Sequence, residues 1–378
     1  MTVRTALLAH GSAELYGSDR VFLESVTGLA EAGWRVVVTL PREGPLAAAV
    51  ERAGARVVHC PVPVLRKEAL RPAGFARLLA TAGRAVLPMA RLLRAERPDL
   101  VYVNTVTVPM WLPLARLFRR PVLAHVHEAE DTVAAPVRKG LAAPLLAANT
   151  IVVNSSATGR VLRDSLPRLE KRIRLVYNGV PGPAEPTGPK AEPGTPLRIL
   201  LIGRISPRKG TDVAVEALAL LRAAGRAAVL DVVGSVFPGW EWFERDVRSA
   251  VRARGLDDVV RWHGFRSDVW SALGEADIAI VPSRTETLGN TAIEAQLAGV
   301  PLIVTDVQGL PETVEHGRWA PVVPAEDPRA LAEAIRALAE DWPATAERAR
   351  GARRRAAERF APERYRREIV ALAEEFGQ

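Results

Sequence analysis

Short apolar runs rich in branched residues alternate with helix-length segments along nearly the whole chain of 378 residues. Runs such as ALLAH, RVVVTL, DLVYVN and RILLIG lack strict alternation of apolar and polar residues. Strands of this kind are typical of parallel sheets that are buried on both faces. Their repeated alternation with helices predicts an α/β chain built on doubly wound parallel sheets.

One segment rich in proline and glycine divides this pattern in two. Residues 181–196 read PGPAEPTGPKAEPGTP and show no apolar periodicity, so we interpret them as a linker. The alternation of strands and helices restarts after this segment. The sequence therefore predicts two Rossmann-like parallel-sheet domains that face each other across a cleft, residues 1–182 and residues 196–360.

Ligands of open α/β sheets bind outside the carboxyl ends of the strands. The most informative side chains should therefore lie directly after strands, on the side of each domain that faces the cleft. Closure of the two domains about the linker would assemble such a site and exclude water from it.

Composition excludes several classes of protein. Apolar residues make up 48% and charged residues 25% of the chain, which is ordinary for a folded globular protein and excludes a disordered or fibrous one. Cys60 is the single cysteine, so neither an internal disulfide nor a cysteine metal cluster can form. The N-terminus has too short an apolar run for a signal peptide, and no segment reads as a membrane span. We expect a cytoplasmic protein.

Positive charge is concentrated in the first half of the chain. Residues 1–185 hold 25 basic and 15 acidic side chains, whereas residues 186–378 hold 26 basic and 28 acidic ones. A basic half favours a partner that carries phosphates, a membrane surface or nucleic acid. No basic–aromatic module is recognisable, so we do not expect nucleic-acid binding.

A cationic amphipathic segment is one source of this charge. Apolar side chains recur between Phe75 and Leu93, and Arg77, Arg84 and Arg91 lie on a different face of the expected helix. Such a helix can rest on anionic lipid at the inner face of the plasma membrane. A solvated arginine face is the alternative.

The motif with the most specific spacing is PSRTETLGNTAIEA, residues 282–295, between a predicted strand and a predicted helix. Glu286 should lie in the loop and Glu294 about one turn into the helix, both directed toward the cleft. Gly289 allows a close approach of the backbone to a ligand. The backbone amides of Leu288, Gly289 and Asn290 would form a helix N-terminus that suits a pyrophosphate. Carboxylates beside such a site suit the hydroxyls of a sugar or ribose.

Two alternatives remain open for this motif. Thr291 and Glu294 fit a capping box, with the threonine as the N-cap and the glutamate three residues later. Glu286 by itself fits an ordinary solvated loop.

A second motif, GRISPRKG, follows the first strand of the second half. Gly203 begins the turn, and Arg204 and Lys209 emerge from it. A forked guanidinium and a flexible ammonium can share a diphosphate and offset the charge on a departing nucleotide. The glycine spacing is wrong for a Walker A loop. Ordinary exposed charges on a turn are the alternative.

A glycine loop follows the first strand of the chain. Gly17 and Ser18 predict a loop that leads into a capped helix, where a phosphate or a sugar could sit. The segment lacks a GxGxxG pattern, so it does not support dinucleotide binding. A purely structural glycine is the alternative.

Two histidines end another predicted strand of the first half. Strand alternation places His125 and His127 on one face, close to Glu128, Glu130 and Asp131. His127 is nearer the strand end and is the better candidate for a hydrogen bond to a sugar hydroxyl. A satisfied core histidine is the alternative. A metal site is a weaker one, because no further histidine lies in a matching motif.

Together, these motifs resemble those of the family-4 retaining glycosyltransferases of the GT-B fold, and the resemblance covers nearly the whole chain. The family's Glu-x7-Glu pair is Glu286 and Glu294 here, which implies that Glu286 contacts the transferred sugar and Glu294 the nucleotide ribose. Arg204 and Lys209 match its pyrophosphate-binding pair.

The resemblance extends to the first half of the chain. Gly17 matches the family's N-terminal glycine loop, and His127 matches its histidine beside the donor sugar. The terminal helix of the family returns to the first domain, which implies the same for residues 361–378.

Two departures bear on the choice of sugar. Thr287-Leu288 stands where the family commonly has Gly-Phe, and Tyr16-Gly17-Ser18-Asp19 stands for its Gly-Gly-Ala/Ser-Glu loop. They leave the reaction intact and the identity of the donor sugar open.

The resemblance implies a reaction as well as a fold. The acceptor hydroxyl attacks the face of the sugar that the leaving phosphate departs from, and that phosphate helps to remove the acceptor proton. It also implies that no cofactor and no essential metal is needed, because Arg204, Lys209 and helix amides neutralise the diphosphate. The expected donor is a UDP or GDP sugar. The expected acceptor is a hydroxyl, for example one on a lipid-linked saccharide of a surface or capsular glycan.

Three other functions remain open from the sequence. One is a glycosyltransferase that acts on a small natural product such as an antibiotic. Another is a sugar-nucleotide epimerase on the same architecture. The third is a non-catalytic module that binds nucleotides or glycans.

Overall fold

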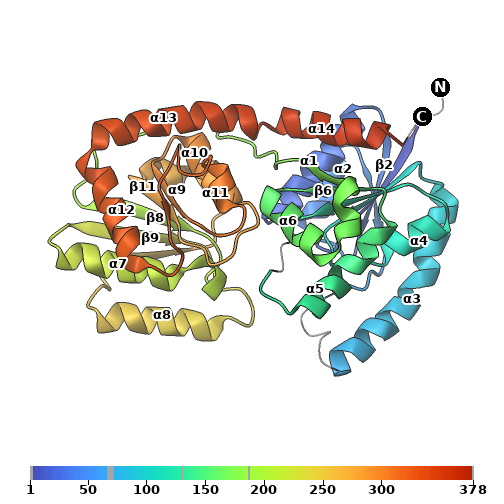
Figure 1. Ribbon diagram of the computed structural model, residues 1–378, viewed down its shortest axis with the longest axis horizontal. Helices are drawn as coiled ribbons and strands as arrows, with labels where there is room; N and C mark the ends of the chain where they lie inside the picture. Colours follow the sequence, from blue (N-terminus) through green and yellow to red (C-terminus); the bar gives the residue numbers. More distant parts are fainter. Residues whose placement is uncertain (1–2, 66–71, 129–130, 186–187, 377–378) are drawn as a thin grey trace. The chain divides into compact units, whose positions relative to one another are not determined.

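The computed structural model describes residues 3–65, 72–128, 131–185 and 188–376, in two compact units. Unit 1 comprises Met1–Gly179 and Ala361–Gln378, and unit 2 comprises Val180–Phe360. The chain thus crosses from unit 1 to unit 2 and returns for its last helix (Figure 1).

Unit 1 is built on a sheet of seven parallel strands in the order β3-β2-β1-β4-β5-β6-β7. The strands are Thr5–Ala9 (β1), Arg35–Leu40 (β2), Arg56–His59 (β3), Leu100–Asn104 (β4), Val122–Val126 (β5), Thr150–Val153 (β6) and Ile173–Leu175 (β7). Burial on both faces explains the continuous apolar runs. In β1, Leu7 and Ala9 enter one core, and Ala6 and Leu8 enter the core on the opposite face.

Helices cover both faces of this sheet. The helices of unit 1 are Gly17–Glu31 (α1), Pro45–Arg52 (α2), Pro72–Glu96 (α3), Trp111–Leu117 (α4), Ala135–Ala142 (α5), Ser156–Ser165 (α6) and Pro362–Glu374 (α14). Buried side chains of α1, α2 and α14 share one core, and those of α3, α4 and α6 share the other. Short 3-10 helices at Ala143–Ala147 and Pro167–Arg172 complete the unit.

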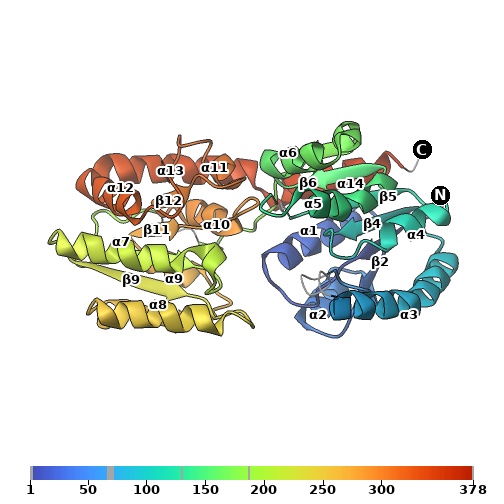
Figure 2. The same ribbon diagram turned by 60° about the horizontal axis from the view of Figure 1, so that its bottom comes forward.

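The terminal helix α14 packs along α1, although the two lie at opposite ends of the sequence (Figures 1 and 2). Arg366 pairs with Glu24 at 2.7 Å and with Glu31 at 3.2 Å. The Tyr365 hydroxyl lies 2.5 Å from that of Ser25. A buried polar contact and apolar packing therefore hold α14 in unit 1.

Unit 2 repeats the same design with six parallel strands in the order β10-β9-β8-β11-β12-β13. The strands are Leu197–Ile202 (β8), Ala228–Val233 (β9), Val260–Gly264 (β10), Ile278–Val281 (β11), Leu302–Thr305 (β12) and Val322–Val323 (β13). The two-residue strand β13 was not predicted, because so short a run carries no periodic signal.

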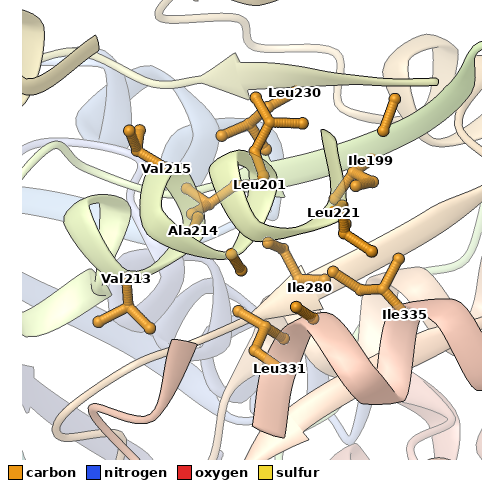
Figure 3. Packing of buried hydrophobic residues seen from close by; sticks show 14 of the residues in the cluster. Ile199, Leu201, Val213, Ala214, Val215, Leu221, Leu230, Ile280, Leu331 and Ile335 are labelled. Atoms are coloured by element: carbon orange, nitrogen blue, oxygen red, sulfur yellow. The ribbon is translucent and has the colours of Figure 1, made fainter. Parts of the chain in front are cut away.

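The helices of unit 2 again form two layers. They are Thr211–Ala223 (α7), Glu241–Ala253 (α8), Trp270–Glu275 (α9), Asn290–Ala298 (α10), Leu310–Thr313 (α11), Pro328–Glu340 (α12) and Trp342–Arg359 (α13), with a 3-10 turn at Pro207–Lys209 (η4). Leu201 and Ile280 from the strands meet Ala214 from α7 and Leu331 from α12 in one core (Figure 3). Figure 2 shows α12 beside α7. Helices α9 and α10 line the core on the opposite face.

Both sheets reverse their strand order at one point. In unit 1 the reversal lies between β1 and β4, and in unit 2 it lies between β8 and β11. These are the switch points at which open α/β sheets bind ligands. The predicted fold class, two Rossmann-like parallel-sheet domains, is confirmed.

The segment that was interpreted as a linker is attached to unit 2 in its described part. Lys190 donates from Nζ to Asp277 at 2.8 Å, and the Trp342 ring donates to the Lys190 carbonyl at 3.0 Å. The amide of Gly188 donates to the carbonyl of Ala298 at 3.1 Å. Proline and glycine density predicted irregular backbone here, but it did not predict that this backbone binds to a domain surface.

Helix α3 runs through Pro88 without a break. Ala85, Met89 and Leu93 are buried, whereas Val86 and Leu87 are exposed. The side chain of Phe75, which the sequence pattern included, lies outside the described residues. None of the described helices is both long enough and apolar enough to cross a lipid bilayer.

Candidate functional site

The first cluster of predicted site residues lies at the switch point of unit 2. The turn after β8 carries Gly203, Arg204 and Lys209, and the loop after β11 carries Glu286. Lys209 and Glu286 form an ion pair between these two loops. Their side chains are 26% and 17% exposed, so the pair is shielded but reachable from solvent. The structure thus joins one residue from each of the two second-half motifs, 77 positions apart in sequence.

Close backbone packing holds the two loops together. Gly210 has φ +68°, and a Cβ atom there would lie 1.9 Å from the carbonyl oxygen of Pro282. A side chain is therefore excluded by backbone atoms as well as by conformation. The stem of Lys209 passes over Gly203, whose Cβ position would be 3.4 Å from it. Lys209 consequently reaches the end of β11 along the surface of its own turn.

Arg284 joins the same loops from the other side. It donates to both carboxylate oxygens of Asp212 at 2.9 and 2.8 Å, to Glu326 at 2.7 Å and to the carbonyl of Pro207 at 2.7 Å. Its hydrogen bonds to Asp212 are the largest reason that the pKa of this arginine is raised. Bidentate pairs of this kind fix geometry strongly. Sequence reasoning missed this clamp, because nothing in a single sequence links positions 212 and 284.

Arg204 turns toward an aromatic ring. Its guanidinium carbon lies 4.7 Å from the ring centre of Phe237, which is itself 40% exposed. A ring face attracts a cation and limits its motion. Arg204 is thereby held at the surface of the β8 turn, where it is exposed.

The loop after β11 ends in the N-terminus of α10, as predicted. Helix α10 begins at Asn290, and Gly289 is its N-cap with φ +102°. A Cβ atom on Gly289 would lie 2.5 Å from a methyl carbon of Leu310 and 3.3 Å from Cγ of Glu286. Leu288 is buried and anchors the turn. The helix end and Glu286 therefore lie together.

The capping-box alternative for Glu294 is wrong. The N-cap of α10 is Gly289 rather than Thr291. Glu294 is the fifth residue of α10 and is half-buried. Glycine takes the cap position because the chain needs a left-handed residue there.

The second cluster lies at the switch point of unit 1. Helix α1 begins at Gly17, within the segment that we expected to form a loop before it, and its N-cap is Tyr16. The Asp19 carboxylate accepts a hydrogen bond from the backbone amide of Tyr16 at 2.8 Å. Asp19 therefore performs the capping that we expected near Ser18. Its other oxygen lies 2.7 Å from Nε2 of His10.

His127 lies directly after β5 and joins this cluster. Its Nε2 is 3.0 Å from the side-chain oxygen of Asn104, at the end of β4. Its backbone amide donates to Glu128 at 3.1 Å. Burial, and then the neighbouring His10, lower the pKa of His127 to about 3. The imidazole is therefore neutral at physiological pH and suits hydrogen bonding rather than ion pairing.

His125 differs from its neighbour, although their ring centres are 4.0 Å apart. It is fully buried, and its Nδ1 lies 2.6 Å from the hydroxyl of Tyr102. That hydroxyl lies 3.0 Å from the hydroxyl of Ser25. The core alternative thus describes His125. No group of three or more metal-ligating side chains converges in the described parts of the chain, which leave out Glu130.

Sequence reasoning missed three members of the unit 1 cluster, His10, Asp19 and Asn104. A signal was present, because His10 follows β1 and Asn104 ends β4, the two strands at the switch point. Polar residues at the ends of neighbouring parallel strands meet at one edge of the sheet. The strand order was needed to use this signal, and the sequence alone does not supply it.

Two family models match the chain. Glycosyltransferase Family 4 matches residues 16–181, and Glycosyl transferases group 1 matches residues 196–341. Each match falls on one of the two sheets and includes its predicted site residues. The chain belongs to the group 1, family 4 glycosyltransferases, which have the GT-B fold.

Individual relatives are distant. WcaL of Escherichia coli (strain K12), a putative colanic acid biosynthesis glycosyltransferase, is 32% identical over 190 residues, which are 48% of this chain and 45% of WcaL. Glycogen synthase of Mycobacterium tuberculosis (strain ATCC 25618 / H37Rv) is 27% identical over 273 residues, 69% of this chain and 65% of that protein. The chain thus matches less than two thirds of the length of either relative.

A solved structure matches over the whole fold. HepE of Anabaena, crystallised in complex with UDP and glucose, has a TM-score of 0.80 at 20% identity, covering 98% of this chain and 99% of that one. At this identity the likeness shows the fold.

Proposed function

We propose that this glycosyltransferase moves a hexosyl unit from a nucleotide-diphosphate sugar to a hydroxyl acceptor, with retention of anomeric configuration. The observation that carries the proposal is the Lys209–Glu286 pair beside the N-terminus of α10, at the switch point of unit 2. A cation and a helix N-terminus suit the diphosphate, and a carboxylate suits the hydroxyls of the sugar.

The pair also suggests how the donor would enter. In the free protein Lys209 is neutralised by Glu286. A bound diphosphate would draw Lys209 away, and the released carboxylate would accept hydrogen bonds from the transferred sugar. Arg204 would bind the same diphosphate, Glu294 the ribose, and Leu288, Gly289 and Asn290 the phosphates through their backbone. Gly203 would let the ligand approach the turn after β8. Gly17 would do the same at the start of α1 in unit 1.

In the reaction, the bond between the anomeric carbon and the phosphate oxygen breaks, and a bond from that carbon to the acceptor oxygen forms. The acceptor proton passes to the departing phosphate. Lys209 and Arg204 would stabilise the charge that develops on the diphosphate. Glu286 and His127 would hold the sugar. Every group here belongs to the chain or its substrates, so the proposed reaction uses no cofactor and no metal.

For the donor we propose a UDP sugar, with a GDP sugar as the alternative. The fold match to HepE, crystallised with UDP and glucose, supports the first choice. Incubation with UDP-glucose, UDP-galactose and GDP-mannose tests it. We expect release of a nucleoside diphosphate from one of the three when an acceptor is present. Isomerisation of the sugar nucleotide without release would favour the epimerase, and binding without turnover would favour the non-catalytic module.

For the acceptor we propose a lipid-linked saccharide in surface polysaccharide assembly. The name of the relative WcaL supports this setting, and so does the surface of α3. Leu79, Val86 and Leu87 are 56%, 43% and 52% exposed there, and Arg84 is exposed beside them. Exposed apolar and cationic side chains on one helix suit peripheral contact with anionic lipid at the cytoplasmic membrane face.

Vesicles test this assignment. We expect the protein to sediment with phosphatidylglycerol vesicles and to lose that binding in an Arg84→Glu, Leu87→Ser variant. Transfer to a small soluble natural product, with no vesicle binding, would favour the antibiotic-type acceptor instead.

A further inference from the structure

A chain of buried polar side chains leads from helix α1 to His127, and the proposed reaction uses only its last member. Asp19 and His10 are each 2% exposed, and Asn104 is fully buried. The links are short: 2.7 Å from Asp19 to His10, 3.0 Å from His10 to Asn104, and 3.0 Å from Asn104 to His127. We call these four residues the polar relay. All of them belong to unit 1.

The first link of the polar relay has a fixed direction. An ionised carboxylate can only accept hydrogen bonds. One oxygen of Asp19 accepts from the backbone amide of Tyr16, and the other faces Nε2 of His10. The proton of the His10 ring therefore sits on Nε2.

The direction of this first hydrogen bond fixes the donor and the acceptor in the remaining links. A neutral imidazole with a proton on Nε2 has a lone pair on Nδ1, and that lone pair faces the side-chain nitrogen of Asn104, which donates to it. The Asn104 oxygen is then directed at Nε2 of His127, which must be the donor. If both ring nitrogens of His10 carried protons, the N–H group at Nδ1 would face the amide nitrogen of Asn104, which is also a donor. His127 consequently carries its proton on Nε2 and a lone pair on Nδ1.

The lone pair of His127 is available to a ligand. No described residue forms a hydrogen bond with Nδ1 of His127. His127 is half-buried, in contrast to the fully buried His125, whose Nε2 has no partner in the described parts of the chain. The relay therefore ends after β5, at the carboxyl edge of the sheet, in a half-buried imidazole whose Nδ1 has no partner among the described residues.

We propose that Asp19, His10 and Asn104 are positioning residues that hold His127 in its Nε2–H tautomer, so that its Nδ1 accepts a hydrogen bond from a ligand hydroxyl. Such a site selects a hydroxyl and rejects a phosphate or carboxylate oxygen, which has no proton to donate. The ligand assignment rests on the proposed function, in which this hydroxyl belongs to the transferred sugar. The tautomer does not depend on that function.

The wild-type protein supplies the first test. The chain has six histidines, so ¹⁵N-histidine labelling gives a simple long-range ¹H–¹⁵N spectrum, and loss of one signal set in His127→Gln assigns the residue. We expect the pattern of an Nε2–H tautomer for both His10 and His127 at neutral pH. An Nδ1–H tautomer at His127, or an imidazolium at His10, would overturn the proposal without any variant.

Asp19→Asn is designed to reverse the relay. The amide of Tyr16 still needs an acceptor, so the oxygen of the substituted side chain should turn to it and leave the new NH₂ group facing His10. Each link then inverts, and His127 should carry its proton on Nδ1. An unchanged His127 tautomer in a folded Asp19→Asn protein would refute the relay.

Two further variants control for a general effect of charge and for a failure of Asp19→Asn to fold. Asp164→Asn makes the same charge change at an exposed position of α6 and should leave the His127 spectrum unchanged. If Asp19→Asn does not fold, Asn104→Leu breaks the relay at its middle and should give a mixture of tautomers at His127. A single Nε2–H tautomer in that variant would also count against the proposal.

Binding connects the tautomer to the ligand. We expect Asp19→Asn to lower the affinity for UDP-glucose about tenfold while the affinity for UDP changes less than about twofold, because only the sugar loses its acceptor. Equal losses for both ligands would contradict the hydroxyl contact. If neither ligand binds the wild-type protein, the donor proposed above is wrong, and the tautomer measurement still decides the relay.

Discussion

The two switch points of this glycosyltransferase share a topology and differ in chemistry. In unit 2 the loops after β8 and β11 bring together charged, partly exposed groups, with Lys209 paired to Glu286 and Arg204 near the surface. In unit 1 the ends of β1, β4 and β5 carry the polar relay, whose interior is buried and whose histidine ring at the end is neutral.

This difference shows that the fold decides where a site lies and the side chains decide what it can hold. Partly exposed charges that neutralise one another can be exchanged for a charged ligand such as a diphosphate. A buried neutral network has a fixed direction and suits a hydroxyl. We therefore assign the diphosphate to unit 2 and a sugar hydroxyl to His127.

The largest expected effect is at Glu286. Glu286→Gln keeps the shape of the side chain and removes the charge that would hold the transferred sugar. We expect turnover of the donor to fall by at least about 10²-fold, while nucleoside diphosphate binding stays equal or strengthens because Lys209 loses its competitor. Steady-state kinetics and calorimetry measure the two quantities. Glu192→Gln, at an exposed position of unit 2, is the matched control, and wild-type turnover in Glu286→Gln would remove Glu286 from the mechanism.

A smaller effect is expected from Gly289→Ala. The substitution forces a side chain into a left-handed backbone and against Leu310, so unit 2 should lose about 1–3 kcal/mol of stability. Chemical denaturation of this variant against the wild type gives the value. Gly83→Ala, in α3 with open space around its Cβ position, is the control and should be neutral or slightly stabilising. A stable Gly289→Ala protein would show that the N-terminus of α10 can rearrange.

The smallest expected effect is on the pH dependence of the stability of unit 1. The pKa of His127 is lowered from 6.5 to about 3 in the folded protein. The unfolded chain therefore binds the extra proton between these values, and stability falls as the pH drops below about 6.5. The loss should approach about 1.4 kcal/mol per pH unit. Thermal unfolding at pH 7.5, 6.5 and 5.5 should show a shallower dependence for His127→Gln, and identical slopes would mean that His127 titrates normally.

Much of the fold was predictable because the spacing of apolar residues indicates where strands and helices occur. The alternation of parallel strands and helices follows from apolar runs and turn residues. The attachment of residues 188–190 to unit 2 was not predictable, since it depends on contacts with Asp277, Ala298 and Trp342.

The candidate site divides in the same way. Glu286, Lys209 and Arg204 stood out because motifs of one strand–loop–helix turn are local in sequence. The clamp of Arg284 on Asp212 and the polar relay join positions from different strands, so only the strand order reveals them. One alternative placed the N-cap of α10 at Thr291 instead of Gly289, because a threonine and a glutamate three residues apart resemble a capping box.

The most direct test of the central claim is the binding of nucleoside diphosphates to three proteins. UDP, GDP, dTDP and ADP are titrated by calorimetry into the wild type, Lys209→Met and His127→Gln. We predict that one diphosphate binds the wild type, that Lys209→Met weakens it by about 10–100-fold, and that His127→Gln leaves it within about twofold. Lys171→Met, an exposed lysine of unit 1, is the charge-matched control. Loss of diphosphate binding in His127→Gln with retention in Lys209→Met, or no binding of any diphosphate to the wild type, would contradict the division between the two units.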